Sequence, residues 1–285
     1  MAAGGIRSRY VMAGPVRTHY SEVGDNGPAV VLCHGGGAGS SGEAGFGPLL
    51  PLLAEHFTVY AIDSVGGYGD TDPYFPCVRG VQSRVEQIED FVDALCLDQI
   101  CIAGNSQGAW VAAKYALGHP DRVSKLFLVA SATIAQAMGI QTPETEGMRA
   151  LRDYDGTRES MRRVLEALIW HQEIITDRLI DIRNEAANRP GAAEARRAFQ
   201  EGMNKFTRDP DLRLNFEMKH SLPRLTIPTA FAWGEEDRFA PATLGRELEK
   251  MLPNIPFHFI PEGGHQVQND QPQAVARLMI ELFSQ

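Results

Sequence analysis

The chain has 285 residues, of which 44% are apolar and 22% charged, and its formal net charge is −9. This composition predicts one large globular domain, or a domain with an insertion, and excludes a disordered or fibrous protein. The negative charge argues against binding to nucleic-acid phosphates or to an anionic membrane. No apolar run approaches a membrane span, and residues 1–12 lack the apolar stretch of a signal peptide, so we expect a cytoplasmic protein.

Short apolar runs recur along the chain, as in strands buried on both faces of a parallel sheet. Residues 10–13 and 16–23 flank Gly14-Pro15 and predict an N-terminal hairpin. Further strands are predicted at 29–33, 57–62, 100–103, 125–130, 229–233 and 257–260. Helices are predicted between them at 81–95, 106–117, 243–251 and 272–283. This alternation predicts an α/β fold with a mostly parallel, doubly wound sheet.

The region from 136 to 221 contains no strand-like run. It consists of charged, amphipathic segments such as 159–170 and 176–188. These segments are either extra helices packed on the sheet or a helical cap over the carboxyl ends of the strands, where open α/β sheets bind ligands. The length and the change in composition favour the cap. We therefore predict a core of residues 1–135 and 222–285 with a cap at 136–221.

The cysteines show no C-x-x-C spacing and the histidines no metal-binding motif. Cys33 and Cys101 lie in predicted core strands, which favours buried free thiols over disulfides. We expect neither a metal nor a cofactor.

The sequence G-N-S-Q-G at residues 104–108 carries the strongest chemical signal. It follows a predicted strand and opens an Ala-rich helix, which is the setting of a nucleophile elbow. In this interpretation Ser106 is the nucleophile, and the N–H of Gln107 points toward the reacting carbonyl oxygen. The alternative is that Ser106 is an ordinary helix N-cap.

A second motif, H-G-G-G-A-G at residues 34–39, directly follows a predicted strand. Glycines allow close approach of the backbone to a ligand and aim N–H groups at an anion. Together with the elbow, the motif predicts Gly36 N–H as the second oxyanion donor, and we expect His34 to brace the loop. A phosphate cradle is the alternative, but the Lys-Ser/Thr ending of a P-loop is absent.

A nucleophilic serine requires a base and a residue that orients the base. Asp237 lies in W-G-E-E-D-R-F-A-P and His265 in P-E-G-G-H, each just after a predicted strand. The chain order Ser, Asp, His is that of serine hydrolases with a nucleophile elbow. Glu235 or Glu236 remains an alternative to Asp237.

These motifs, together with residues 67–73, resemble the α/β-hydrolase superfamily over nearly the whole chain. Within it they look most like the meta-cleavage product hydrolases, which cut a carbon–carbon bond in ring-fission products of aromatic degradation. The triple glycine, Asn105 and the segment 164–186 carry this closer resemblance.

The resemblance implies an α/β-hydrolase fold with an inserted helical cap, and it assigns residues that bind substrate. Arg183 matches an arginine that grips the dienoate carboxylate, although a surface ion pair is its alternative role. Phe239 matches an apolar residue of the acyl-side pocket. The other substrate-binding residues implied are Gly35, Gly37, Asn105 and Gln266. The chain departs from the family at two positions, with Gln266 in place of the usual Trp and Gly45 in place of a frequent Asn.

The predicted function is therefore hydrolysis of a C–C bond in 2-hydroxy-6-oxo-hexa-2,4-dienoates, which gives a 2-hydroxypenta-2,4-dienoate and a carboxylic acid. The alternative is a carboxylesterase or lactonase with the same triad, favoured by the two departures. A third hypothesis is a non-catalytic receptor. The partner is a small-molecule substrate, and a homodimer or higher homo-oligomer is left open.

Overall fold

The computed structural model describes residues 5–285, so residues 1–4 of the segment tested for a signal peptide lie outside it. Its sheet has the strand order β1-β2-β4-β3-β5-β6-β7-β8. The strands are β1 (Arg7–Ala13), β2 (Val16–Val23), β3 (Ala29–Cys33), β4 (Thr58–Ile62), β5 (Ile100–Asn105), β6 (Val123–Val129), β7 (Thr229–Gly234) and β8 (Phe257–Ile260). β2 runs antiparallel to β1 and to β4, and the remaining pairs are parallel. The mostly parallel sheet and its antiparallel start are confirmed.

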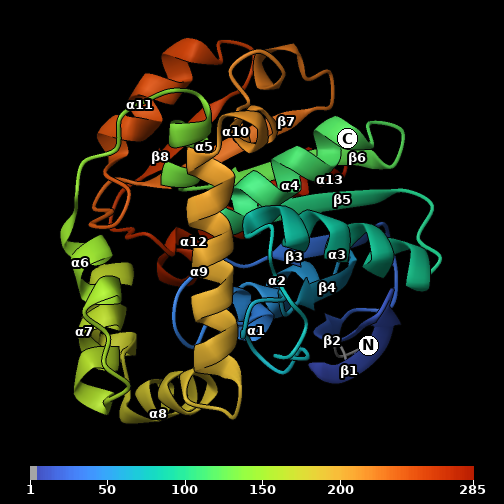
Figure 1. Ribbon diagram of the computed structural model, residues 1–285. Coiled ribbons are helices and arrows are strands. Elements are labelled where there is room, and N and C mark those ends of the chain that lie inside the picture. Colours follow the sequence, from blue (N-terminus) through green and yellow to red (C-terminus); the bar gives the residue numbers. More distant parts are fainter. Residues whose placement is uncertain (1–4) are drawn as a thin grey trace.

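Helices cover both faces of the sheet. Figure 1 shows α3 (Val81–Ala94) and α4 (Gln107–Gly118) in front of the strands and α13 (Pro272–Phe283) behind them. The shorter core helices are α1 (Gly42–Phe46), α2 (Leu50–Leu53), α5 (Ala132–Ala137), α11 (Ala242–Met251) and α12 (Val267–Asp270). The buried face of α4 is formed by small residues and Trp110, which lets the helix pack closely on the sheet.

Between β6 and β7 the chain forms helices after α5. They are α6 (Glu146–Arg152), α7 (Arg158–Leu168), η1 (Gln172–Ile174), α8 (Asp177–Ala187), α9 (Ala192–Arg208), α10 (Pro210–Phe216) and η2 (Leu222–Arg224). In Figure 1, α6, α7 and α8 form a group beside the sheet, and the long helix α9 leads from this group back to the core. Their buried residues form a separate apolar cluster that includes Met161, Leu165 and Ile180.

Some element boundaries differ from the predicted ones. β6 begins at Val123 rather than near residue 125, because Val123 pairs with Ile100 before the register shifts to the pair Cys101 and Lys125. Ser106 precedes α4 instead of belonging to it. Cys33 and Cys101 are buried free thiols, as predicted.

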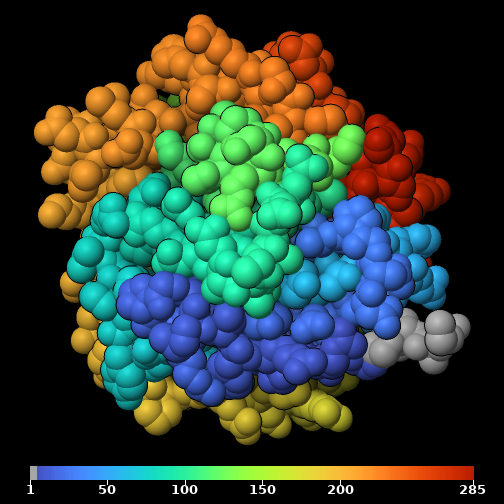
Figure 2. Space-filling view, turned by 90° about the vertical axis from the view of Figure 1, so that its right-hand side faces the viewer, coloured from blue at the N-terminus to red at the C-terminus, as the bar shows by residue number. Residues whose placement is uncertain are grey.

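The parallel strands place all their carboxyl ends at one edge of the sheet, where the candidate residues follow them. Figure 2 shows the side of the molecule at the right of Figure 1, where the N-terminal hairpin (blue) lies beside the segments that lead into β5 and β6 (green). Within residues 5–285, no helix combines the length and the apolar character needed to cross a membrane.

Candidate active site

Ser106 occupies a sharp turn between β5 and α4. Its backbone has φ 58° and ψ −119°, a conformation that costs a non-glycine residue free energy and marks functional turns. The turn requires Gly104 and Gly108, because a Cβ on Gly104 would lie 2.1 Å from Gly108 O and one on Gly108 would lie 2.0 Å from Cys33 O. Ser106 N–H donates to Val129 O over 2.9 Å, which fixes the turn on β6.

His265 and Asp237 meet at the carboxyl ends of β7 and β8. The His265 Nδ1 atom lies 2.8 Å from Asp237 Oδ2, and both side chains are buried. The other carboxylate oxygen, Asp237 Oδ1, accepts from the backbone N–H groups of Phe239 and Ala240, each over 2.7 Å. Asp237 is therefore fixed on both sides, which leaves His265 Nδ1 as the donor and its Nε2 as the acceptor.

The two alternative acids lie elsewhere. Glu235 pairs with Arg246, and Glu236 Oε2 accepts from Gly263 N–H. Within the described residues, the structure joins His265 to Asp237 and to neither glutamate. No hydrogen bond connects Ser106 Oγ to His265 in the same residues, a contact that in ligand-free enzymes is often long and tightens with substrate.

The glycine loop after β3 lies against the serine. A Cβ on Gly35 would lie 3.1 Å from Ser106 Cβ, and one on Gly36 would lie 2.5 Å from the Gln107 side chain. His34 Nδ1 donates to Gly35 O, and Ser40 Oγ donates to Gly36 O. Both carbonyl groups are thus engaged within the loop.

His34 itself is held as a neutral ring. Its Nε2 atom accepts from Ser64 N–H over 3.0 Å, and its Nδ1–H donates to Gly35 O over 2.6 Å. Burial lowers the pKa of His34 to about 3. The expected bracing role of His34 agrees with these contacts.

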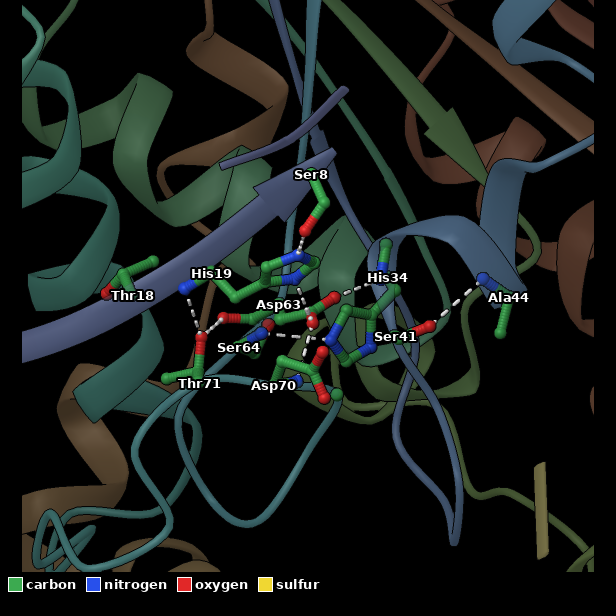
Figure 3. A network of polar contacts seen from close by, with 12 residues as sticks. Ser8, Thr18, His19, His34, Ser41, Ala44, Asp63, Ser64, Asp70 and Thr71 are labelled. Carbon is green, nitrogen blue, oxygen red and sulfur yellow. Dashed lines mark hydrogen bonds and ion pairs between the residues drawn. The ribbon is translucent and has the colours of Figure 1, made fainter. Parts of the chain in front are cut away.

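A polar network around Asp63 lies next to the His34 brace of the glycine loop (Figure 3). Asp63 accepts from His19 Nδ1 and from the backbone N–H groups of Gly42 and Asp70, each over 2.7 Å. Gly42 is the first residue of α1, His19 belongs to β2 and Asp70 lies in the loop after β4. The Asp63 carboxylate therefore joins these three segments. His19 Nε2 also contacts Ser8 Oγ at 2.8 Å.

Ser106 and His265 line a small cavity of about 40 Å³. Its apolar wall is made by Leu151, Leu168 and Phe239. The Phe239 ring stacks on the His265 ring with 4.8 Å between centroids, and Gly147 leaves room for it, since a Cβ there would lie 2.3 Å from the Phe239 ring.

Arg183 lines a second, larger cavity of about 550 Å³. The side chain is 1% exposed, and the guanidinium makes no hydrogen bond or ion pair with any described residue. Burial lowers the pKa of Arg183 to about 10, so it remains a cation at neutral pH. A buried cation without a protein partner is costly unless an anion joins it.

Packing fixes Arg183 on the glycine loop. Gly39 has φ +70°, and a Cβ on it would lie 2.1 Å from Arg183 O. The backbone of α8 therefore rests directly on the loop that follows β3. Apolar side chains, among them Leu165, Ile169 and Leu179, form much of the surrounding wall.

Gln266 lines both cavities. Its backbone N–H donates to Leu168 O, which joins the loop carrying His265 to the end of α7. Asp270 strengthens this junction by accepting from the N–H groups of Trp170 and His171. Gln266 is the residue that the linings of the two cavities share.

The structure brings most of the predicted site residues together. The small cavity is lined by Gly35, Gly36, Asn105, Ser106, Gln107, Phe239, His265 and Gln266. Asn105 Nδ2 donates to His265 O over 3.0 Å, and this bond holds the backbone of the histidine. Arg183 lies in the neighbouring cavity. Gly37, which the resemblance assigned to substrate binding, lies in the lining of neither cavity, and a Cβ on it would lie 3.2 Å from the Leu151 side chain.

Sequence reasoning missed Leu151, Leu168 and Asn269. Asn269 lines the larger cavity and lies three residues after Gln266, a helical spacing that was the available signal. The two leucines belong to amphipathic segments of the insertion, in which no feature of the sequence indicates which apolar residue faces the site.

Comparison with known proteins places the chain in a family. A family model described as alpha/beta hydrolase fold matches residues 28–272. The chain is 29% identical to 2-hydroxy-6-oxo-2,4-heptadienoate hydrolase of Pseudomonas putida over 97% of its own length and 96% of that protein. It is also 29% identical to 2-hydroxy-6-oxo-6-(2'-aminophenyl)hexa-2,4-dienoic acid hydrolase of Metapseudomonas resinovorans, over 97% and 90% of the two chains. A meta-cleavage product hydrolase from Pseudomonas fluorescens IP01, solved with acetates, superposes with a TM-score of 0.80 at 28% identity and covers 97% of each chain.

Proposed function

Since the chain belongs to the alpha/beta hydrolase fold family, we propose that it is a serine hydrolase that cleaves a C–C bond in 2-hydroxy-6-oxo-hexa-2,4-dienoates. The similarity to hydrolases named for such dienoates supports the substrate class. The observation that carries the proposal is the buried Arg183, whose guanidinium has no partner among residues 5–285 and lines a cavity adjoining the Ser106 cavity.

In this proposal His265 takes the proton of Ser106 Oγ, and Asp237 holds the imidazole in the required tautomer. The N–H groups of Gly36 and Gln107 bind the oxyanion, a contribution of about 3 kcal/mol per donor in serine hydrolases. The carbonyl groups of Gly35 and Gly36 are already bonded inside the loop, which supports an inward orientation of the N–H groups.

The dienol is first converted to its keto form by protonation at C5 and loss of the proton from the C2 hydroxyl. Ser106 Oγ then attacks C6, the C5–C6 bond breaks, and the bonding pair moves into the conjugated system. Water hydrolyses the acyl-enzyme to release the carboxylic acid. Arg183 would hold the substrate carboxylate through two parallel hydrogen bonds and so align C6 with the serine.

In this proposal the group carried by C6 would occupy the small cavity next to Ser106. An engineered apolar cavity of about 150 Å³ accepts benzene, whereas the space beside Ser106 is about 40 Å³. We propose that the enzyme prefers a short 6-alkyl group to a 6-aryl group. The helices between residues 136 and 221 would act as the cap that encloses the substrate.

A carboxylesterase or lactonase is the second candidate, favoured by Gln266 and Gly45. A Cβ on Gly45 would lie 3.1 Å from His34 Cβ, so this position is adapted to the brace of the glycine loop. We further propose a cytoplasmic location, which agrees with the four free cysteines.

The test compares turnover of 2-hydroxy-6-oxo-hepta-2,4-dienoate, its 6-phenyl analogue and p-nitrophenyl acetate. We expect Arg183→Ala to lower kcat/KM for the dienoate about a hundredfold and to change that for the neutral ester less than threefold. Arg183→Lys should restore part of the dienoate rate. A wild type that prefers the ester to the dienoate would establish the esterase in place of the C–C hydrolase.

A further inference from the structure

The side-chain amide of Gln266 has a fixed orientation because of a neighbour. Asn269 Nδ2 donates to Gln266 Oε1 over 3.2 Å and to Ala44 O over 3.1 Å. Both bonds require Asn269 to present its amino group, since Ala44 O can only accept. In the flipped arrangement Asn269 Oδ1 would face two acceptors.

The contact with Asn269 occupies the oxygen of Gln266 and leaves its nitrogen free. No described residue accepts a hydrogen bond from Gln266 Nε2, although the residue is only 5% exposed. Gln266 lines both the Ser106 cavity and the Arg183 cavity, so a ligand that spans the two cavities would contact this residue. In this arrangement Asn269 Oδ1 is buried without a hydrogen-bond partner among the described residues, which costs folding free energy. The orientation of the Asn269 amide is therefore kept in spite of this cost.

We propose that Gln266 Nε2 donates a hydrogen bond to the oxygen on C2 of a 2-hydroxy- or 2-oxo-carboxylate, and that Asn269 is the positioning residue that aims this donor. This inference rests on the proposed function for the placement of the ligand. With the carboxylate at Arg183 and C6 at Ser106, C2 is the atom next to the carboxylate that carries an oxygen.

The chemistry of C–C cleavage gives this donor a catalytic role. In the keto intermediate, C2 carries a carbonyl group conjugated to the C3–C4 double bond. When Ser106 Oγ bonds to C6 and the C5–C6 bond breaks, the electron pair forms the C4–C5 double bond. The C3–C4 pair then moves to C2–C3, and the C2 oxygen receives the negative charge. A donor aimed at this oxygen stabilises the leaving dienolate, which water protonates to the 2-hydroxydienoate.

Two inhibitors that differ only at C2 test the donor without requiring C–C cleavage. The inhibition constants of 2-oxopentanoate and pentanoate are measured against hydrolysis of p-nitrophenyl acetate. We expect the wild type to bind the 2-oxo acid about tenfold more tightly, as for one buried hydrogen bond. Gln266→Met keeps the size but removes the donor, and the ratio should fall to about one.

Asn269→Asp tests the positioning role. An aspartate would accept from Gln266 Nε2 and leave the Gln266 oxygen, instead of the nitrogen, for the ligand, so the preference for the 2-oxo acid should again disappear. Asn204→Asp makes the same chemical change on the exposed face of α9 and should leave the ratio unchanged. Because the new charge also weakens both acids, the ratio and not either constant is the measured quantity.

The outcomes separate this inference from the proposed function. A wild-type ratio near one, or a Gln266→Met variant that keeps the wild-type ratio, overturns the inference even if dienoates are cleaved. Equal weakening of both inhibitors in Gln266→Met shows a role in shape only and overturns it as well. A tenfold ratio that depends on Gln266 and Asn269 supports the inference, and absence of dienoate turnover in that enzyme would refute only the C–C hydrolase.

Discussion

Two groups of serine, histidine and aspartate occur in the molecule, and their histidine–aspartate contacts are almost the same. His265 Nδ1 lies 2.8 Å from Asp237, and His19 Nδ1 lies 2.7 Å from Asp63. In the second group the serine is also within hydrogen-bond distance of the histidine, because Ser8 Oγ is 2.8 Å from His19 Nε2. Hydrogen bonding among the three side chains therefore does not distinguish a catalytic site.

The surroundings of the two serines differ. Ser106 has strained backbone at the start of a helix and lines a cavity with the glycine loop, whereas Ser8 lies in a regular strand paired with β2. Asp63 uses its oxygens to hold Gly42 and Asp70 in addition to His19. The first group is organised around a reacting atom and the second around the junction of three segments.

The largest expected effect separates the two serines. Ser106→Ala should lower kcat by a factor on the order of 10⁶, because the nucleophile is lost while substrate still binds. Ser8→Ala should leave kcat within twofold. Both rates are measured with the same dienoate and ester. Substantial turnover by Ser106→Ala, or a comparable loss in Ser8→Ala, would contradict this division of roles.

The two aspartates should differ in the property that they control. Asp237→Asn leaves an oxygen for the N–H groups of Phe239 and Ala240 but disfavours the reactive tautomer of His265, so kcat should fall by about 10³ to 10⁴ with little loss of stability. Asp63→Asn places an amino group against the donors His19 and Asp70 and should cost about 2 kcal/mol of unfolding free energy.

The measurements are kcat and urea denaturation of both variants. Glu236→Gln is the control in the Asp237 loop and should affect neither quantity strongly. Our assignment of the triad acid is wrong if Glu236→Gln lowers kcat as much as Asp237→Asn.

The framework of the site was predictable from the sequence because each part follows from local signals. Continuous apolar runs marked the parallel strands, and Ser106, Asp237 and His265 each follow such a run. Parallel strands end at a common edge, so three residues distant in sequence were expected to meet. The burial of Arg183 also had a local signal, since it shares one face of α8 with the buried residues Ile180 and Ala187.

Features that depend on tertiary packing were not predictable. His19 and Asp63 are 44 residues apart, and neither belongs to a motif that signals their contact. The division of the interior into two cavities at Gln266 depends on how α7 docks on the loop of His265. The orientation of the Gln266 amide depends on Asn269 and on a carbonyl of α1, so no single segment contains it.

The histidine that braces the glycine loop should make stability depend on pH. The pKa of His34 is about 3 in the folded chain and near 6.5 when exposed, so below pH 6.5 the unfolded chain binds a proton that the folded chain does not. The contribution of the neutral His34 ring to the unfolding free energy is complete above pH 6.5 and decreases as the pH falls toward 3. Between pH 6.5 and pH 5 the loss should be about 2 kcal/mol.

Urea unfolding of the wild type and of His34→Asn at pH 7 and pH 5 measures this effect. The variant is less stable at pH 7 because the bond to Gly35 is altered, but its stability should change less with pH. An equal loss in both proteins would show that other groups cause the acid sensitivity.

The smallest expected effect concerns the hydroxyl of Ser8. Its bond to His19 Nε2 lies at the edge of the sheet and is partly buried, so Ser8→Ala should lower the unfolding free energy by about 1 kcal/mol. Ser284→Ala, at an exposed position with no side-chain hydrogen bond among the described residues, should change it by less than about 0.5 kcal/mol.

The double variant Ser8→Ala with Asp63→Asn sharpens the test, because Ser8 and Asp63 act through the same imidazole. Its loss should be smaller than the sum of the two single losses, since an imidazole already released from Asp63 gains less from Ser8. Additive losses would mean that His19 does not couple the two residues, and the resemblance between the two groups would then be one of distances alone.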